Sequence, residues 1–210
     1  MTRIESIAAQ PDRAGRYLVR FSDGSSMRLY RQTVEDFSLY TGMELADGQL
    51  DALRSAAGQM SAKMRAVRIV AASNVSKRDL EQRLIHKGET PKQAQQAVAW
   101  MEELSLVDDS RTARQLVESC ARKGYGLNRA KQMLYEKQIP KSLWNDALAD
   151  YPDQSGEILK FLRSRLSAGC EPRDIRRVTD ALLRRGHSYR DIRKAIELLC
   201  LDTEDFQEEF

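Results

Sequence analysis

The sequence has few of the residues that mark several common protein classes. Its 210 residues include three cysteines, 11 glycines and five prolines. Cys120, Cys170 and Cys200 are far apart and odd in number, which argues against a disulfide framework and against a zinc site. No apolar run is long enough to span a membrane, and the first residues lack a signal-peptide pattern. We therefore expect a cytoplasmic protein.

Histidine is scarcer still, and no catalytic constellation is visible. His86 and His187 each stand beside a glycine that suits a helix end, where a histidine favours the helix dipole. The run Gly124-Tyr125-Gly126 lacks the lysine-serine ending of a phosphate loop, and it follows a helical pattern. Asp108 and Asp109 suit a helix cap better than a metal pair. We expect no enzyme, no metal and no cofactor.

The residues that are abundant favour helices. Hydrophobic residues make up 41% of the chain and charged residues 31%, which is typical of a folded, helix-rich protein and not of a disordered one. A chain of this length forms one large domain or two to three small ones. We predict a mainly α fold.

The first part of the chain, residues 1–46, is an exception and predicts strands. Tyr17, Val19 and Phe21 alternate with other residues, and Met27 and Leu29 alternate after the turn Ser22-Asp23-Gly24-Ser25. An Asp-Gly pair tolerates the positive φ angles of a tight hairpin. We predict a small antiparallel β-domain that is marginal by itself and packs on the next helix.

A long helix is predicted over residues 47–73. Apolar residues recur there at spacings of three and four, beginning with Leu50 and Leu53 and ending with Val67 and Val70. This stripe is long enough to join the β-domain to the rest of the chain. Met60 and Met64 suit either an adaptable binding surface or an ordinary core position.

The remainder of the chain is repetitive. Ser76 and the run Thr90-Pro91-Lys92-Gln93 are helix-start signals, and Gly88 stands where a helix end belongs. Counted from Ser76, shifts of 50 and then 48 residues match apolar positions, with Leu84, Leu134 and Leu182 in register and Ala97, Ala147 and Ala195 likewise. We predict tandem three-helix repeats over 76–124 and 126–169, with a shortened third repeat over 172–201. Such an array is extended and has no deep pocket.

Charge is unevenly distributed along the chain. All 34 Lys and Arg and 26 of the 31 acids precede residue 202, which gives residues 1–201 a charge of +8 and the tail 202–210 a charge of −5. A basic body favours a polyanionic or acidic partner. The acidic tail suits either an internal competitor for that partner or a frayed, solubilising end.

Basic residues are the main functional signal. Arginine suits bidentate contacts to phosphate or carboxylate, and too few aromatic residues accompany it to indicate base stacking. Helix-turn-helix, zinc-finger and RNP patterns are absent. The candidate binding residues are Lys77, Arg78, Arg83, Lys87, Arg111, Arg114, Arg122, Lys123, Arg129, Lys131, Arg173, Arg176, Arg177, Arg184, Arg185, Arg190 and Arg193.

Four motifs occur in order on the repeat period. They begin at Ser76-Lys-Arg-Asp79-Leu80, at Val107-Asp108-Asp109, at Arg122-Lys123-Gly124 and at Leu183-Arg184-Arg185-Gly186. Their order and spacing resemble the RecX family, bacterial regulators of the RecA recombinase, over about Ala66 to Leu199. The N-terminal part is similar to an extension that some members carry. The chain departs from the family at Ala72-Ser73-Asn74, where arginines are usual, and at Thr112, where an aromatic residue is usual.

The resemblance implies tandem three-helix repeats and a function without catalysis. Family members bind in the groove of the RecA–single-stranded DNA filament. They inhibit RecA's ATPase, strand-exchange and co-protease activities, and so modulate recombination, DNA repair and the SOS response. The resemblance thus implies RecA and single-stranded DNA as partners. The sequence pattern itself predicts no membrane partner, and it predicts a monomer, because the apolar stripes need no second copy to close the core. The residues leave two other functions open: a DNA-binding protein acting independently of RecA, and an adaptor that binds an acidic protein.

Overall fold

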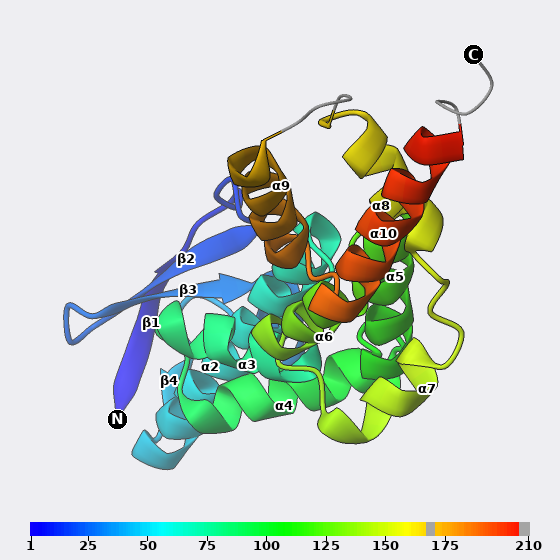
Figure 1. The fold of residues 1–210 in the computed structure, drawn as a ribbon. Coiled ribbons are helices and arrows are strands. Elements are labelled where there is room, and N and C mark those ends of the chain that lie inside the picture. The colour runs from blue at the N-terminus through cyan, green and yellow to red at the C-terminus, as the bar shows by residue number, and fades with distance from the viewer. Residues whose placement is uncertain (167–170, 206–210) are drawn as a thin grey trace. The chain divides into compact units, whose positions relative to one another are not determined.

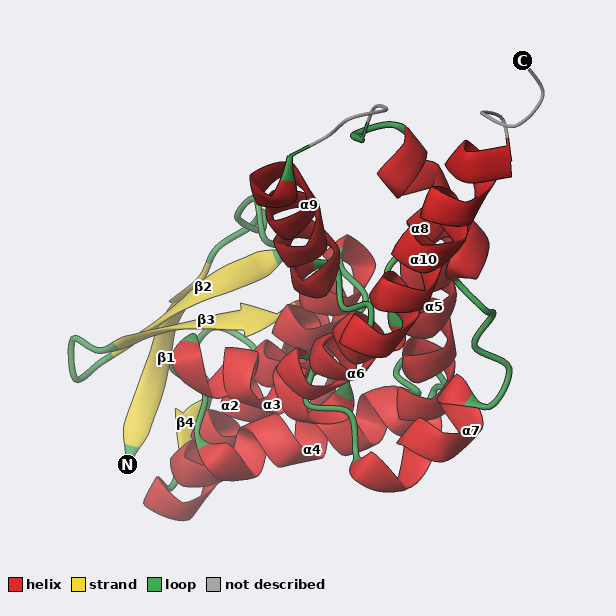
Figure 2. Cartoon of the chain, viewed as in Figure 1, coloured by secondary structure: helices red, strands yellow, loops and turns green. Residues whose placement is uncertain are grey.

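The computed structural model describes residues 1–166 and 171–205 (Figure 1). It is mainly helical with a small antiparallel sheet at the N-terminus, as predicted (Figure 2). The chain divides into two compact units, Met1–Val107 and Asp108–Phe210. Cys170, the side chain of Cys200 and residues 206–210 of the predicted tail lie outside the described part.

The sheet has four strands in the order β3-β2-β1-β4. They are β1 (Thr2–Ile7), β2 (Arg16–Phe21), β3 (Ser26–Tyr30) and β4 (Glu44–Leu45), and the short helix α1 (Arg31–Asp36) follows β3. The predicted hairpin joins β2 to β3, with Gly24 at φ 80° and the Asp23 carboxylate accepting a hydrogen bond from the Ser25 amide at 2.9 Å. Alternation along these strands sends one row of side chains inward.

The sheet packs on the long helix α2 (Asp47–Ala72), whose bounds agree closely with the prediction. Phe21 and Leu29 of the sheet share a core with Leu50 and Leu53 of α2, and each of the four is at most 6% exposed. The small sheet therefore depends on the N-terminal half of α2, as its size led us to expect.

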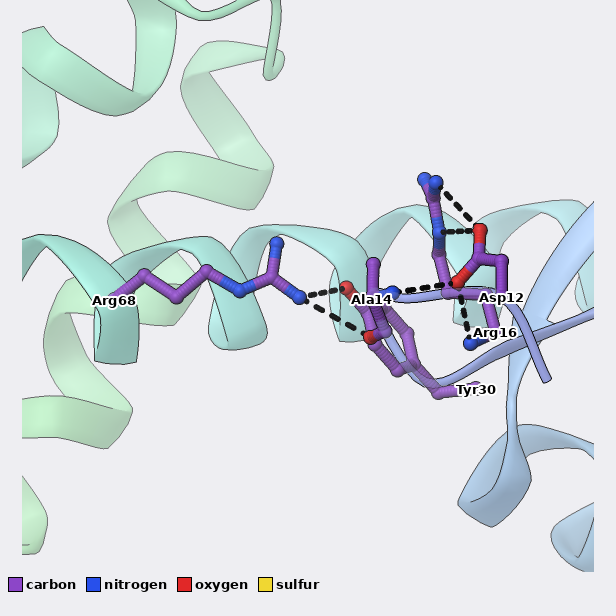
Figure 3. Close-up of polar contacts among 5 residues, drawn as sticks. All are labelled: Asp12, Ala14, Arg16, Tyr30 and Arg68. Atoms are coloured by element: carbon purple, nitrogen blue, oxygen red, sulfur yellow. Dashed lines mark hydrogen bonds and ion pairs between the residues drawn. The ribbon is translucent and has the colours of Figure 1, made fainter.

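Arg68 connects the C-terminal half of α2 to the N-terminal β-domain (Figure 3). Its guanidinium donates hydrogen bonds to the Ala14 carbonyl and to the Tyr30 hydroxyl, both at 3.2 Å. Asp12 organises the adjoining loop by accepting from the Arg16 guanidinium at 2.8 and 3.0 Å and from two backbone amides. These hydrogen bonds hold the pKa of Asp12 below its usual value.

A second core in the first unit forms around α3 (Lys77–His86) and α4 (Pro91–Glu103). Leu80 and Leu84 of α3 pack there with Ala62 and Ala66 of α2. The predicted caps are present: Ser76 accepts from the Asp79 amide at 3.0 Å, and a capping box begins α4. The two ends of α2 thus serve two different cores, while Met60 and Met64 between them are partly exposed.

The second unit contains two further cores. The first forms from α5 (Asp109–Arg122), α6 (Leu127–Glu136) and the turn and helix η1 (Lys141–Leu143) and α7 (Trp144–Leu148). The second forms from α8 (Ser155–Arg163), α9 (Pro172–Arg184) and α10 (Tyr189–Asp205). Helix α10 continues past Leu201 into the first four residues of the predicted tail.

The helices group differently from our prediction. We placed α3, α4 and α5 in one repeat (76–124), whereas the cores join α2 to α3 and α4, α5 to α6 and α7, and α8 to α9 and α10. The third repeat accordingly has three helices and is not shortened. The period itself holds, since the second helices end at His86, Glu136 and Arg184 and the third elements begin at Pro91, Lys141 and Tyr189. A period is the same whichever helix is counted first, so it does not fix the phase.

Candidate polyanion-binding surfaces

Most of the predicted basic residues are exposed and unpaired. Within residues 1–166 and 171–205, eleven of them are exposed and form no ion pair. A cation on a long side chain with no internal acceptor remains available for an external phosphate or carboxylate. These residues are Arg78, Lys87, Arg111, Arg114, Arg122, Lys123, Lys131, Arg176, Arg177, Arg184 and Arg190.

Five of the predicted residues are instead held by carboxylates of the same unit. On α3, Arg83 forms two bonds to Asp79, at 2.7 and 3.0 Å, and a third to the Ser73 hydroxyl. The others pair at 2.8 to 3.5 Å, and a partner would have to compete with these contacts. Those four pairs are Lys77 with Glu102, Arg129 with Glu136, Arg173 with Glu171 and Arg193 with Glu197.

Arg185 has a structural position that the sequence did not indicate. Its guanidinium lies 5.9 Å from the ring centre of Tyr125 and 5.0 Å from that of Phe161. Its carbonyl accepts a hydrogen bond from the Gly126 amide at 2.9 Å. Cation–π contacts of this kind hold the side chain in place. Arg185 therefore joins α9 to its neighbours and is less available to a partner than Arg184, which is exposed.

Helix α9 presents the densest row of arginines. Pro172 begins the helix, and Val178 and Leu182 turn into the core, at 7% and 1% exposed. With 3.6 residues per turn, Arg177 and Arg184 lie within about 20° of each other around the helix. Both are exposed on the side opposite Leu182. The same periodicity that buries the apolar stripe therefore aligns the guanidinium groups toward solvent.

Helix α5 presents a similar face. Asp108 caps it by accepting from the Ser110 and Arg111 amides, and these bonds lower the pKa of Asp108. The inward face carries Ala113, Val117 and Cys120, and burial raises the pKa of the Cys120 thiol. The outward face carries Arg111, Arg114 and Arg122, all exposed. The predicted cap is thus confirmed, and it positions three unpaired cations.

A joint of two glycine-containing loops connects the two bundles of the second unit. The Asn128 amide donates to the Gly186 carbonyl at 3.1 Å, next to the Gly126–Arg185 bond. His187 lies in this joint, 4% exposed, and burial lowers its pKa while a hydrogen bond with the Gly124 backbone opposes that shift. We expected a histidine at a helix end. His86 is the last residue of α3, whereas His187 is buried beyond the end of α9.

Three cavities in the described part of the second unit are small. One of about 230 Å³ is lined by Lys160, Phe161, Arg185 and His187 among others, and two more measure about 280 and 300 Å³. Pockets for small ligands begin at roughly 300 Å³ and are usually larger. Lys160 was not among the predicted residues, and nothing in its sequence context distinguishes it from other exposed lysines. Binding through exposed helix faces suits this geometry better than binding in a pocket.

Two further features concern residues 1–166 and 171–205, the part of the chain that the structure describes. No three histidine, cysteine or acidic side chains in that part of the chain lie together so that they could hold a metal ion. None of the helices described is both long enough and apolar enough to cross a membrane.

Comparison with known proteins finds a family match over the bundle of α5, α6 and α7. Residues 108–148 match the family model for "RecX, second three-helix domain". This range begins at the cap of α5 and ends with α7, so it coincides with the helices that share one core. The match therefore supports the grouping of helices seen in the structure.

Relatives that match longer stretches of the chain agree with this match. "Regulatory protein RecX" of Cronobacter sakazakii is 33% identical over 96 residues, which are 41% of this chain and 58% of that protein, so less than two thirds of the relative is matched. "Regulatory protein RecX" of Vibrio vulnificus is 27% identical over 140 residues, covering 65% of this chain and 92% of the relative. These relatives carry the name of a regulatory protein and not of an enzyme.

A solved structure shows the same fold. A crystal structure of regulatory protein RecX superposes with a TM-score of 0.67 at 22% identity, over 94% of this chain and 100% of the other. RecX from Lactobacillus salivarius gives 0.59 at 20% identity, over 70% and 99%. The matched domain, the relatives and the repeated three-helix cores thus all make the chain similar to regulatory proteins of the RecX family.

Proposed function

We propose that this protein binds the RecA–single-stranded DNA filament and restrains RecA. It inhibits ATP hydrolysis, strand exchange and co-protease activity, and thereby modulates recombination, DNA repair and the SOS response. The similarity to RecX proteins supports the proposal, since this is the function that the resemblance implies. The repeats lie along the filament groove and contact neighbouring RecA protomers.

The observation that carries the proposal is the set of unpaired cations on the outward faces of α5 and α9. Arg111, Arg114 and Arg122 on α5 and Arg177 and Arg184 on α9 are exposed. Both helices bury an apolar row on the side opposite these arginines, so the charged row faces solvent. Guanidinium groups in such rows suit the phosphates of a nucleic acid or the carboxylates of a filament surface.

The direct test is RecA's DNA-dependent ATP hydrolysis with increasing amounts of this protein. We expect inhibition at amounts comparable to RecA, and its absence at that ratio would refute the proposal. The double variant Arg177→Gln/Arg184→Gln should inhibit less than the wild-type protein. A matched double variant, Arg31→Gln/Arg54→Gln, removes two exposed arginines from surface ion pairs of the first unit and should inhibit as the wild type does.

A DNA-binding protein that acts without RecA is the second candidate, and the same unpaired arginines favour it. It would bind bare single-stranded DNA as tightly as it binds filaments. A gel shift at two salt concentrations tests this, because the logarithm of a phosphate-driven affinity falls by about 0.7 per contact for each tenfold rise in salt. Binding that survives nuclease treatment would instead indicate an adaptor for an acidic protein.

We also propose that the protein acts as a cytoplasmic monomer. Each of the three helical cores is closed by helices of this chain, so no second copy is needed to cover an apolar face. Size-exclusion chromatography with light scattering should give a mass near 24.0 kDa. A concentration-independent dimer would contradict the proposal.

A further inference from the structure

Each helical bundle exposes an apolar side chain at the same position. Ile85 is 39% exposed, Tyr135 70% and Leu183 40%. Each is the next-to-last residue of the second helix of its bundle, because α3, α6 and α9 end one residue later. The three residues are separated by 50 and 48 positions, which are the repeat intervals of the sequence.

The cores do not require these side chains. The residue before each one is Leu84, Leu134 or Leu182, and these leucines are at most 1% exposed. The next residue along a helix points about 100° away, so an apolar side chain there is not part of the inward stripe. A single exposed apolar residue is ordinary on any protein surface. Its recurrence at one position of all three bundles is what calls for an explanation.

An unpaired cation accompanies each of these residues. Arg78 lies seven residues before Ile85, Lys131 four before Tyr135, and Arg176 seven before Leu183. Spacings of four and seven place both members of a pair on one side of a helix. All three cations are exposed and without an ion pair in the part of the chain that the structure describes. We call the pairs Arg78/Ile85, Lys131/Tyr135 and Arg176/Leu183 the repeat faces.

We propose that the three repeat faces are equivalent contacts to a protein partner that presents one surface several times. That surface is an apolar depression edged by carboxylates: the apolar side chain enters it, and the cation meets its acidic rim. The inference rests on the proposed function, in which the repeating partner is the RecA filament. It adds that these positions contact RecA subunits and not DNA.

The chemistry of the repeat faces favours protein over nucleic acid. Binding to a single strand uses phosphate contacts and aromatic stacking, and neither isoleucine nor leucine stacks on a base. Apolar side chains surrounded by polar groups are instead typical anchors of protein interfaces. Isoleucine and leucine are wholly apolar, and tyrosine has an apolar ring with a hydroxyl at its tip, so the feature common to the three is an apolar contact surface. The cation at each face supplies charge complementarity to an acidic rim.

The test compares filaments with bare DNA. A triple variant, Ile85→Ser/Tyr135→Ser/Leu183→Ser, is measured against the matched control Tyr40→Ser/Leu104→Ser/Leu106→Ser, which alters one aromatic and two aliphatic side chains of 49 to 64% exposure elsewhere. Fluorescence anisotropy gives the affinity of each protein for RecA filaments and for single-stranded DNA alone. Circular dichroism confirms that every variant is folded.

We expect the triple variant to lose about tenfold or more in filament affinity, with its affinity for bare DNA unchanged. Each single variant should lose roughly two- to threefold, since the three contacts are equivalent and act together. The control should bind filaments as the wild type does. Equal loss on filaments and on bare DNA, or no loss on filaments, would overturn the inference. If the wild-type protein itself does not bind filaments, the proposed function fails first.

Discussion

Two equivalent glycines, Gly88 and Gly186, allow the joint in the second unit to be tested quantitatively. Both follow the second helix of a bundle, and both have positive φ, at 94° and 87°. A Cβ added at Gly88 would meet no atom within 4 Å, whereas at Gly186 it would lie 2.3 Å from the Arg129 backbone nitrogen. The substitutions Gly88→Ala and Gly186→Ala therefore share the same backbone strain and differ in the contact.

The expected difference follows from these contacts. Alanine in the left-handed region costs about 1 to 2 kcal/mol at either position. At Gly186 the added methyl group also forces apart two packed backbones, at about 1 to 3 kcal/mol. The bonds from Gly126 to Arg185 and from Asn128 to Gly186 would weaken too, at roughly 0.5 to 1.5 kcal/mol each. We expect Gly88→Ala to cost ~1 to 2 kcal/mol and Gly186→Ala to cost about 3 to 8 kcal/mol.

The two tryptophans allow each unit to be followed separately. Trp100 lies on α4 of the first unit, and Trp144 begins α7 of the second, where its indole donates to the Ile139 carbonyl at 3.0 Å. Urea unfolding of Gly186→Ala is followed by Trp144 fluorescence with Trp100 replaced by phenylalanine. Urea unfolding of Gly88→Ala is followed by Trp100 fluorescence with Trp144 replaced by phenylalanine.

The reasoning is refuted if Gly186→Ala costs no more than Gly88→Ala. Amide hydrogen exchange supplies a second reading at the joint itself. The Gly126 and Asn128 amides should exchange much faster in Gly186→Ala than in the wild-type protein, because they lose their carbonyl partners. Unchanged protection of both amides would show that the joint accommodates a methyl group.

Three further predictions concern polar groups that are buried or partly buried. Burial lowers the pKa of His187 from 6.5, so the contribution of this side chain to stability is complete above about pH 6.5 and is lost as the pH falls toward the folded-state pKa. Between pH 7.5 and pH 5, the urea midpoint of His187→Gln should therefore decrease less than that of the wild-type protein. Glu89→Ala should cost roughly 1 to 3 kcal/mol, because the Arg65 guanidinium 3.2 Å from this 7% exposed carboxylate loses its acidic partner; a double-mutant cycle with Arg65→Ala should give an interaction energy above zero. Tyr151→Phe should cost about 1 to 2 kcal/mol, because the hydroxyl donates to the Tyr125 carbonyl at 2.6 Å; ultraviolet titration should show Tyr151 ionising near the pKa of about 12 to which burial raises it.

Much of the local structure could be predicted from the sequence because its causes are local. The Asp-Gly turn, the cap at Ser76 and the cap at Asp108 depend on residues within four positions of one another, and all three are present. The long helix from Asp47 was predicted from an apolar period of three and four, and it ends at Ala72. Signals of this kind need no knowledge of distant contacts.

The candidate site was predictable only in part. Exposed rows of arginine follow from the apolar period, since a helix that buries one side must expose the other. Pairing does not follow from it: Lys77 meets Glu102, 25 residues away, through the packing of α3 near the end of α4. Arg185 stacks on Tyr125 and Phe161, which come from other parts of the second unit. Such contacts join residues that no sequence spacing relates.

The sequence by itself determined which structural elements this protein contains: a small sheet, a long helix and a 50-residue repeat of three helices. Only the tertiary structure decided where each repeat begins. A helix with one apolar stripe can pack against the helix before it or after it, and the period is equal in both cases. The cores show that α5 packs with α6 and α7, and that the end of α2 serves as the first helix of the first repeat. The choice depends on which stripes meet in three dimensions, because burial of apolar surface, and not local propensity, stabilises one grouping over the other.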